Sequence, residues 1–471
     1  MKKPIILLFL VLAFVPAYSQ PTLPQQLDAV VKEASQKQVF SGNALITQND
    51  QILYQASVGQ ADRDRGILNT ADTKFQIGSI TKFFTRILVL QLVEAKKLNM
   101  SDKISTYLTG FSPTIGNTVT IEHLLDHRSG LGSYYDLPSW NEENIHSISD
   151  IIKVIQQEKL AFQPGSASKY SNSGYVVLAA IIEKLTKQNF GIVLQNRLFD
   201  KIGLKNTGYS LVNVAMQGKA VGYLTNQPNK PNNLRFKIIG GGDGGIYSTT
   251  GDMRLLASSL LHDNRLLTDE SKVKLFDVMR SPEAPTTWQA FQEKGRMTIA
   301  GGAPGLNAVF GINRAKNYVM VILSNFDEGS AEQVAMRLSA VMNGKTPEPF
   351  EEAGEGGAAG NLYKWLLAND KGDFTTAYKD IYKKMGVPLD DDMQLLYAGQ
   401  RLMQEKRFDK ALILYQTYTH DFPQIVVAWN DLGDVYLAIN DKPNAIRCYQ
   451  KALELRPSNP RATNALKKLG Q

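Results

Sequence analysis

Cysteine is almost absent from this chain of 471 residues, in which Cys448 is the only one. A lone cysteine cannot form an internal disulfide, so we expect hydrophobic cores alone to hold the fold. The chain also lacks a segment in which basic residues cluster, because its 52 Lys and Arg are scattered among 45 Asp and Glu. The formal net charge is +7. Scattered charge argues against nucleic acid as a partner. The length favours two or three compact units.

Long apolar runs are scarce as well, and the one that exists stands at residues 1–20, MKKPIILLFLVLAFVPAYSQ. Two lysines precede the run and small residues end it, which predicts a signal peptide over residues 1–19, cleaved before Gln20. The alternative is an uncleaved anchor, but the run is shorter than the roughly 20 apolar residues of a spanning helix. We therefore expect an exported protein, periplasmic or secreted, with no membrane span after cleavage. Loss of Lys2 and Lys3 leaves a net charge of +5 (7 − 2).

Two segments far apart in the chain alternate apolar and polar residues around a turn. They are SGNALITQNDQILYQASVGQA at 41–61 and LNAVFGINRAKNYVMVILSN at 306–325. Each pattern predicts a β-hairpin, and the segments between them are mostly helical or loop-like. This order predicts an α+β unit over residues 20–346, with an antiparallel sheet, flanking helices and a large helical insertion.

Residues 347–360 are rich in Gly, Ala and Glu and predict a linker to a repeat region over 361–471. Every key position of the tetratricopeptide pattern is present in one copy, at Trp429, Leu432, Gly433, Tyr436, Ala445, Tyr449, Ala452 and Pro457. The positions 34 residues earlier hold residues that are mostly compatible with the same pattern. The positions a further 34 residues earlier match it only in part, as a degenerate copy. The segment 459–470 would close the array. The resemblance to tetratricopeptide repeats implies an all-α solenoid with a groove for a protein or peptide partner, although a packing appendage stays an alternative.

Three Ser-x-x-Lys matches occur, and their surroundings separate them. Ser79 with Lys82 opens SITKFFTRILVLQLVEAKKLN, which is apolar around most of its circumference and therefore belongs in a domain centre. A spacing of three residues puts both side chains on one face of a helix, and burial would make the neutral amine more accessible as a base. The alternative is a helix-capping serine with a surface lysine. The pair at 166 and 169 lies in a loop with no buried helix behind it, and the pair at 271 and 274 begins a segment whose polar face is expected to be solvated. Both are expected to be chance matches.

Several blocks in order resemble the class C β-lactamase and penicillin-binding-protein-like serine hydrolases. The blocks are FQIGSITKFFT, TIEHLLDHRSGL, QPGSASKYSNSGYVVLAAIIEKLT, LFDKIGLKNTGY, GGIYSTTGDM and GGAPGLNAVF, between about residues 35 and 345. An ordered set is far more specific than any one motif. The resemblance implies the serine β-lactamase/transpeptidase-like fold and a mechanism that needs no metal and no cofactor.

The resemblance also implies roles for individual residues. Ser79 would be the acylated nucleophile, Lys82 its base and Tyr170 the proton shuttle, while Asn172 would hold Lys82 and the substrate amide. The backbone amides of Ser79 and Gly302 would form the oxyanion hole, with Gly301 and Gly302 lining the substrate site. His127 has no matching acid or metal partner, so we expect it to be structural.

The third family motif departs from the pattern, because Ile299-Ala300-Gly301 stands where a cation, a hydroxyl residue and a glycine are expected. Lys294 and Arg296 lie nearby, but their strand parity differs from that of Ile299, so they should face away. The loss puts β-lactam hydrolysis and D-Ala-D-Ala carboxypeptidase activity in doubt. We expect an acyl-Ser79 hydrolase of an ester, amide or peptide bond on a small-molecule or peptide substrate; the alternative is a catalytically weak penicillin-binding-like scaffold.

Overall fold

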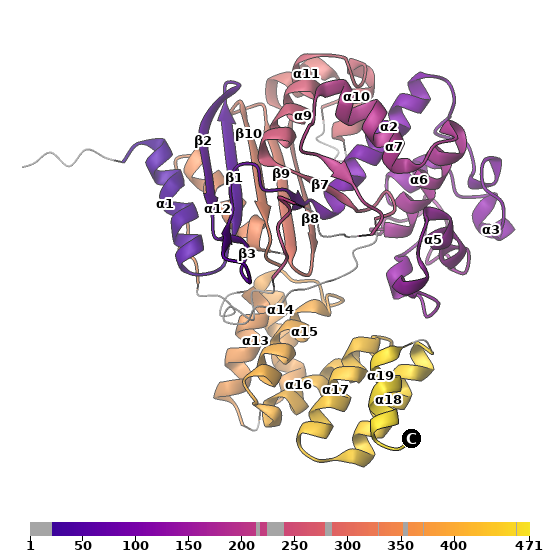
Figure 1. The fold of residues 1–471 in the computed structure, drawn as a ribbon, viewed down its shortest axis with the longest axis vertical. Helices are drawn as coiled ribbons and strands as arrows, with labels where there is room; N and C mark the ends of the chain where they lie inside the picture. The colour runs from indigo at the N-terminus through magenta and orange to yellow at the C-terminus, as the bar shows by residue number, and fades with distance from the viewer. Residues whose placement is uncertain are drawn as a thin grey trace, which may run out of the picture.

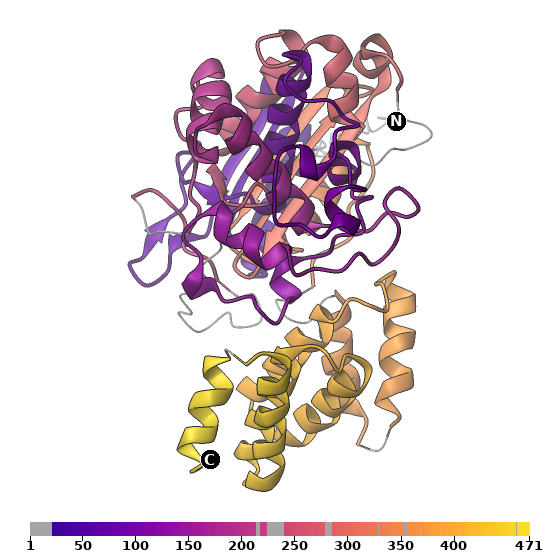
Figure 2. The same ribbon diagram turned by 90° about the vertical axis from the view of Figure 1, so that its right-hand side faces the viewer.

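The computed structural model describes residues 21–212, 217–223, 240–277, 285–327, 329–351, 357–370, 372–457 and 459–471. Two bodies are visible, a sheet with helices on both faces and a smaller group of helices at the C-terminal end (Figures 1 and 2). The predicted signal peptide lies outside the described residues. Within the described ranges, no helix is long and apolar enough to cross a membrane.

The main sheet has five antiparallel strands in the order β2-β1-β10-β9-β8. Their bounds are β1 (Gly42–Gln48), β2 (Gln51–Val58), β8 (Arg296–Ala303), β9 (Leu306–Asn313) and β10 (Tyr318–Ser324). Both predicted hairpins are confirmed, as β1-β2 and β9-β10. β1 pairs with β10, with Ile46 opposite Met320, so the two ends of this unit meet in mid-sheet. β8 is left at the edge, beside the helical insertion.

Short strands complete the unit in two further sheets, β3-β4 and β5-β7-β6. Their bounds are β3 (Gln60–Asp62), β4 (Ile67–Leu68), β5 (Phe75–Gln76), β6 (Gly208–Tyr209) and β7 (Ile246–Ser248). β5 leads the chain directly from the sheet region into the segment that carries Ser79.

Helices cover both faces of the main sheet (Figure 1). On one face, α1 (Leu23–Gln36) and α12 (Ser330–Met342) pack over the alternate strand residues Ile46, Val309 and Met320. The opposite face packs against the helical insertion through Phe310, Val321 and Leu323. The α-helices of that layer are α2 (Thr81–Glu94), α3 (Pro113–Gly116), α4 (Ile121–Leu125), α5 (Ile148–Ile155), α6 (Asn172–Thr186), α7 (Phe190–Leu194), α8 (Asp200–Ile202), α9 (Thr250–His262), α10 (Asp269–Phe276) and α11 (Trp288–Lys294). Short turns of other helix types join them: η1 (Gly78–Ile80), η2 (Ile104–Thr106), η3 (Tyr134–Asp136), η4 (Glu142–Asn144) and the π-helical η5 (Gln195–Phe199).

α2 runs through the middle of this layer, as its all-round apolar sequence predicts. Eleven of its residues are buried, including the charged Lys82 and Arg86. A helix that is apolar on nearly every side can bury itself only by being enclosed. The residues at the beginning of α2 are therefore held rigidly on all sides.

The C-terminal body is a stack of antiparallel helices, as the repeat pattern predicts. Its members are α13 (Gly357–Ala368), α14 (Phe374–Met385), α15 (Met393–Gln404), α16 (Phe408–Asp421), α17 (Val426–Ala438), α18 (Lys442–Leu455) and α19 (Pro460–Lys468). The repeat is visible in packing: a Cβ on Gly399 would meet the Tyr415 ring at 2.5 Å, and one on Gly433 would meet the Tyr449 ring at 2.8 Å. Each glycine thus lets a tyrosine ring lie against the preceding helix. α13 begins inside the predicted linker, because Ala358 is buried in this core.

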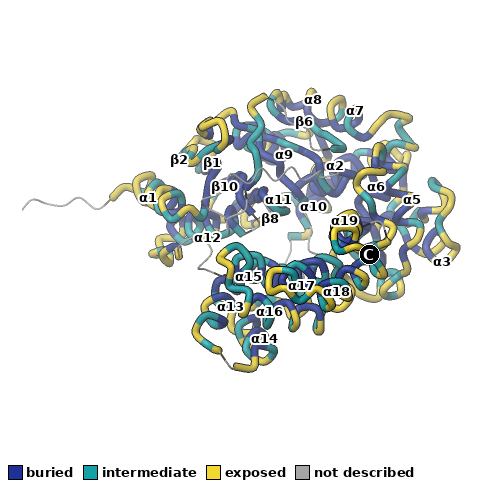
Figure 3. Tube along the Cα trace, turned by 60° about the horizontal axis from the view of Figure 1, so that its bottom comes forward, coloured by how far each residue is buried: buried dark blue, intermediate teal, exposed yellow. Residues whose placement is uncertain are grey.

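One edge of the helical stack meets the sheet-containing unit. Arg456 donates from Nη2 to the Tyr135 backbone carbonyl at 3.3 Å, and the Tyr135 carbonyl belongs to η3. In the view of Figure 3, buried residues fill the interior of both bodies. The contact is close to the residues discussed next.

Candidate active site

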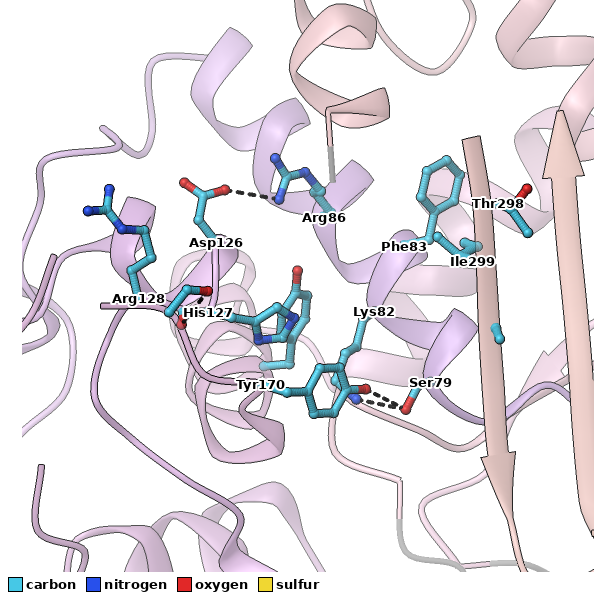
Figure 4. A pocket seen from close by; sticks show the side chains of 13 residues that line it. Ser79, Lys82, Phe83, Arg86, Asp126, His127, Arg128, Tyr170, Thr298 and Ile299 are labelled. Atoms are coloured by element: carbon cyan, nitrogen blue, oxygen red, sulfur yellow. Dashed lines mark hydrogen bonds and ion pairs between the residues drawn. The ribbon is translucent and has the colours of Figure 1, made fainter. Parts of the chain in front are cut away.

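Ser79 stands in η1, two residues before α2 begins. Its Oγ accepts hydrogen bonds from Lys82 Nζ at 3.0 Å and from Tyr170 OH at 2.7 Å (Figure 4). The capping position of α2 belongs to Ile80, which makes no side-chain cap bond. The alternative interpretation, a capping serine with a surface lysine, is therefore wrong: Lys82 is 6% exposed.

Lys82 Nζ is held by three oxygen atoms. Besides Ser79 Oγ, it donates to Asn172 Oδ1 at 2.8 Å and to the Asp243 backbone carbonyl at 3.1 Å. It also lies 4.8 Å from the centre of the Tyr170 ring. The three ammonium protons match three acceptors, so the orientation of the amine is fixed.

Burial lowers the pKa of Lys82 to about 8, although the nearby Asp243 carboxylate acts in the opposite direction. Desolvation disfavours the charged ammonium form, since an ion loses hydration when it is buried. A pKa near 8 leaves roughly a tenth of the molecules with a neutral amine at pH 7, against far less than a hundredth for an ordinary lysine. Lys82 is therefore suited to accept the proton of Ser79.

Tyr170 and Asn172 reach the site from the chain entering α6. Ser171 between them caps α6 by accepting a hydrogen bond from the Gly174 amide, and this cap turns the neighbouring side chains toward Ser79. Asn172 Nδ2 donates to Ser133 Oγ at 3.2 Å, which leaves its oxygen pointing at Lys82. The Tyr170 side chain is 54% exposed, so its hydroxyl stands at the mouth of the site.

His127 supports Tyr170. The two rings stack with centroids 4.7 Å apart, and His127 Nδ1 accepts from the Ser171 amide at 3.1 Å. Burial, together with the charges of Lys82 and Arg86, lowers the pKa of His127 to about 4. A neutral ring stacked behind the tyrosine is consistent with the structural role predicted for it.

The predicted oxyanion donors lie close together, because β8 passes tightly against η1. A Cβ on Gly301 would lie 2.2 Å from Ile77 O and 2.6 Å from the Ser79 amide nitrogen. A Cβ on Gly78 would lie 3.0 Å from the Gly302 amide nitrogen. Only glycine allows this approach. This close approach is compatible with the predicted oxyanion hole, in which a carbonyl oxygen would accept from the amides of Ser79 and Gly302.

A cavity of about 590 Å³ opens beside Ser79 between α2, β8 and the loop that carries His127. Its lining residues are Ser79, Lys82, Phe83, Arg86, Asp126, His127, Arg128, Ser168, Tyr170, Tyr175, Thr298, Ile299 and Ala300. Ile299 is part of the wall, at the position where a cation was expected (Figure 4). Arg296 lines a different groove, beside α12. Lys294 ends α11 rather than lying on the strand, so the parity argument applies to Arg296 alone.

Asp243 is a component that sequence reasoning missed. Its side chain is buried, with Oδ2 accepting from Tyr134 OH and Oδ1 from the Gly241 amide, both at 3.1 Å. Burial raises the pKa of the Asp243 carboxyl, while the Lys82 charge lowers it. The available signal was a carboxylate within GGGDGG, where a buried charge among glycines indicates a constrained polar site.

The other two Ser-x-x-Lys pairs have ordinary surroundings. Ser166 Oγ donates to the Gln163 carbonyl in a loop, and Lys274 forms an ion pair with Glu270 on α10. Neither pair resembles the arrangement at Ser79. Across the described ranges, no group of three or more His, Cys, Asp or Glu side chains could hold a metal ion.

Comparison with known proteins agrees with this geometry. Residues 27–341 match the model of the beta-lactamase family, and residues 426–459 match the tetratricopeptide repeat. A putative penicillin-binding protein PbpX of Bacillus subtilis is 29% identical over 298 residues, which cover 62% of this chain and 72% of that protein. Penicillin-binding protein 4* of the same organism is 28% identical over 341 residues, 67% of this chain and 75% of that protein.

Solved structures share the fold of the larger unit. A penicillin-binding protein from Bacillus halodurans is 26% identical with a TM-score of 0.58, covering 67% of this chain and 98% of that one. A class C beta-lactamase has a TM-score of 0.56 at 19% identity, covering 68% and 96%. The family model spans most of the chain and contains Ser79, Lys82 and Tyr170 in hydrogen-bonding contact, so the chain belongs to the beta-lactamase family, with penicillin-binding-protein relatives and a C-terminal tetratricopeptide repeat.

Proposed function

We propose that the protein is a serine hydrolase that cleaves an ester, amide or peptide bond through an acyl-Ser79 intermediate. The observation that carries the proposal is the position of Ser79 Oγ between Lys82 Nζ at 3.0 Å and Tyr170 OH at 2.7 Å. A serine hydroxyl is a weak nucleophile until a positioned base takes its proton. Here two groups capable of proton transfer touch the same oxygen.

In the first half-reaction, Ser79 Oγ attacks the substrate carbonyl carbon while its proton passes to the neutral amine of Lys82. The carbonyl oxygen becomes an oxyanion and accepts hydrogen bonds from the amides of Ser79 and Gly302. The bond to the leaving group then breaks, and Tyr170 OH delivers a proton to the leaving atom and is reprotonated from Lys82. The products are acyl-Ser79 and a free alcohol or amine.

In the second half-reaction, water takes the place of the leaving group. Tyr170 and Lys82 together accept one proton from the water as its oxygen attacks the acyl carbon, and return it to Ser79 Oγ as the acyl bond breaks. Asn172 keeps Lys82 oriented throughout, through the contact at 2.8 Å. The exposed position of Tyr170 gives water access to the acyl group.

Ile299 points to substrates that carry no free carboxylate beside the cleaved bond. A charge-assisted hydrogen bond is worth about 1.5–3 kcal/mol, or roughly ten- to a hundredfold in affinity, and an isoleucine cannot supply one. Carboxylate-bearing β-lactams and D-Ala-D-Ala peptides should therefore be poor substrates. Neutral esters and amides lose no binding free energy at this position, because they carry no carboxylate for a cation to bind.

Labelling tests the proposal. Purified protein is treated with a serine-reactive fluorophosphonate and, separately, with a fluorescent penicillin, beside Ser79→Ala as the control. Fluorophosphonate label that depends on Ser79, with little penicillin label, is the expected result. No Ser79-dependent label from either probe would favour the second candidate, a binding protein without efficient turnover, which the missing cation at Ile299 suggests.

We also propose export, supported by the pattern of residues 1–19. Mass spectrometry of the protein secreted by its host should find Gln20 as the first residue; an N-terminus at Met1 would contradict cleavage.

The repeat region is proposed to bind a protein or peptide partner in a groove lined by successive repeats, at Gln400, Met403, Gln404, Tyr415, Asp431, Asp434 and Arg461. Cross-linking in the host, followed by purification, should retain partners with Lys451→Ala on α18 and lose them with the double change Gln400→Ala and Gln404→Ala. Equal recovery with both variants would contradict a groove-bound partner.

A further inference from the structure

The cavity beside Ser79 follows α2 for two turns. Four residues of this segment line it, at spacings of three, four and seven: Ser79, Lys82, Phe83 and Arg86. These spacings place the side chains on one face of a helix. Seven residues at about 1.5 Å each separate Ser79 from Arg86 by roughly 10 Å along the helix. Its volume of about 590 Å³ lies in the range of small-molecule sites, roughly 300–1,000 Å³.

The middle of the cavity is apolar and firmly packed. Phe83 forms one wall, and its ring is fixed by Phe276 and Phe310, each with its centroid 6.0 Å away. Ile299 forms the facing wall from β8 and packs against the same hydrophobic core. Rigid apolar walls favour an apolar ligand group, since burying each methylene contributes about 0.8 kcal/mol.

The far end of the cavity is polar, and the Arg86 charge there is paired. Arg86 Nη1 lies 3.3 Å from Asp126 Oδ1, and both side chains are almost fully buried. The remaining Arg86 donors are directed to the carbonyls of Leu125 and Lys274. Asp126 thus compensates the Arg86 charge in place. Arg128, which also lines the cavity, directs Nη2 to the Gly165 carbonyl. The choice of ligand group therefore rests on the apolar walls formed by Phe83 and Ile299.

The arrangement of Tyr170 and Asn172 decides which part of the substrate enters. Tyr170 lines the cavity, whereas Asn172 is not among its described lining residues and directs its amide to Ser133. The group that leaves must take its proton from Tyr170 OH, so the leaving atom lies on the Tyr170 side of the carbonyl carbon. The acyl part then extends toward Asn172.

From this geometry we infer that the cavity between α2 and β8 is a leaving-group site for an uncharged, apolar alcohol or amine, with a chain of about six carbon atoms. The inference rests on the proposed function and names its substrate class. In the acylation step, Ser79 Oγ forms a bond to the acyl carbon, the bond from that carbon to the leaving oxygen or nitrogen breaks, and Tyr170 gives the leaving atom its proton. The apolar chain of the departing alcohol stays between Phe83 and Ile299 until it exits.

The test uses full-length protein and acetate esters that differ only in the alcohol: ethanol, butan-1-ol, hexan-1-ol and 6-hydroxyhexanoate. The kcat/KM should rise up to fourfold for each added methylene from ethyl to hexyl. The carboxylate-ended ester should fall at least tenfold below hexyl acetate. Ethyl esters of acetate, butyrate and hexanoate should show a weaker trend; a steeper trend for them than for the alcohol series would overturn the assignment.

Ile299→Lys is the informative variant, because it places a cation in the apolar wall. It should lower kcat/KM for hexyl acetate at least tenfold and raise the relative rate for the 6-hydroxyhexanoate ester. Met336→Lys is the matched control. Met336 is 63% exposed on α12, so this substitution adds the same charge outside the cavity. A loss of the same size in both variants would contradict the inference.

Binding to Ser79→Ala separates the pocket from the chemistry. Hexan-1-ol should give saturation-transfer NMR signals with Ser79→Ala, and these should disappear when Ile299→Lys is added; hexanoate should give none in either case. If fluorophosphonate labels Ser79 but neither chain length nor hexan-1-ol binding behaves in this way, the leaving-group site is wrong and the proposed function stands. If Ser79 is not labelled while hexan-1-ol binds as described, the pocket stands and the proposed function fails.

Discussion

Lys82 and Asp243 meet through the backbone: Lys82 Nζ donates to the Asp243 carbonyl oxygen at 3.1 Å, while Tyr134 and Gly241 hold the carboxylate of the same residue. One residue therefore positions the amine through its carbonyl and influences its charge through its side chain. The Asp243 carboxylate raises the pKa of Lys82 and so opposes the larger lowering by burial. The availability of the base depends on the balance of the two.

Asp243→Asn should shift the acidic limb of the kcat/KM pH profile to lower pH. The limb reports deprotonation of Lys82, whose pKa is about 8. Removing a negative charge that raises this pKa moves it further down, so the active form appears at lower pH. The asparagine keeps oxygen and nitrogen atoms near Tyr134 and Gly241.

Glu158→Gln is the control for this profile. Glu158 is a second buried carboxyl group, which accepts from the Gly132 amide and from Ser173. Its removal should leave the limb in place. A limb that moves upward in Asp243→Asn, or equally in both variants, would show that the Asp243 charge does not act on Lys82.

Tyr170→Phe should lower the rate of acylation about 10²- to 10⁴-fold, the usual contribution of a positioned general acid or base. The phenyl ring keeps its stacking on His127, and the Tyr170 side chain is 54% exposed. The free energy of unfolding should therefore change by less than about 0.5 kcal/mol. Measurement of kcat/KM for hexyl acetate, whose alcohol needs a proton to leave, paired with urea denaturation, would check both halves. An unchanged kcat/KM in a folded variant would contradict the proton-shuttle role of Tyr170.

Gly301→Ala should destabilise the protein and block acylation together. The new methyl group would lie 2.2 Å from Ile77 O and 2.6 Å from the Ser79 amide nitrogen, so β8 has to move away from η1. Overpacking of this kind costs about 1–3 kcal/mol. The two oxyanion donors would also separate. Gly244→Ala is a matched control, because nothing lies within 4 Å of its Cβ position, and it should label normally.

Local spacing explains which parts of the site the sequence predicts. Ser79 and Lys82 are three residues apart, and Tyr170 and Asn172 two apart, so each pair is visible in a short motif. The Lys82 contact with Asp243 joins residues separated by 161 positions, and no local pattern reports such a contact. The same holds for the Arg86 ion pair with Asp126, which compensates the Arg86 charge at the end of the cavity.

The start of α2 shows a second limit of sequence reasoning. A serine ahead of an apolar helix left a cap open as the alternative to a nucleophile, whereas the structure places a 3-10 turn there, with Gly78 at a φ of 50°. A left-handed glycine turns the chain so that Ser79 Oγ faces Lys82 rather than the helix amides. The hairpins of the sheet were simpler to predict, because alternation and turn residues are encoded within about 20 residues of sequence.

Arg456→Glu should release the repeat region from the sheet-containing unit. Arg456 is half-buried and donates to the Tyr135 carbonyl, and its charge faces Asp136. Burial and the nearby Asp392 raise the pKa of Asp136, whereas Lys169 and Arg456 lower it. A glutamate at 456 would put a third carboxylate beside Asp136 and Asp392, and like charges at a half-buried contact repel each other.

Small-angle scattering should record a larger radius of gyration for Arg456→Glu, and hydrogen exchange should accelerate at residues 134–136. Lys451→Glu on α18 is the matched charge reversal, since Lys451 is 42% exposed and pairs only locally, with Glu454. At 1 M salt, where the Debye length is about 3 Å, part of the expansion should disappear. An unchanged radius and unchanged exchange in Arg456→Glu would mean that the contact with Tyr135 does not hold the two bodies together, and that the repeats influence Ser79 only through what they bind.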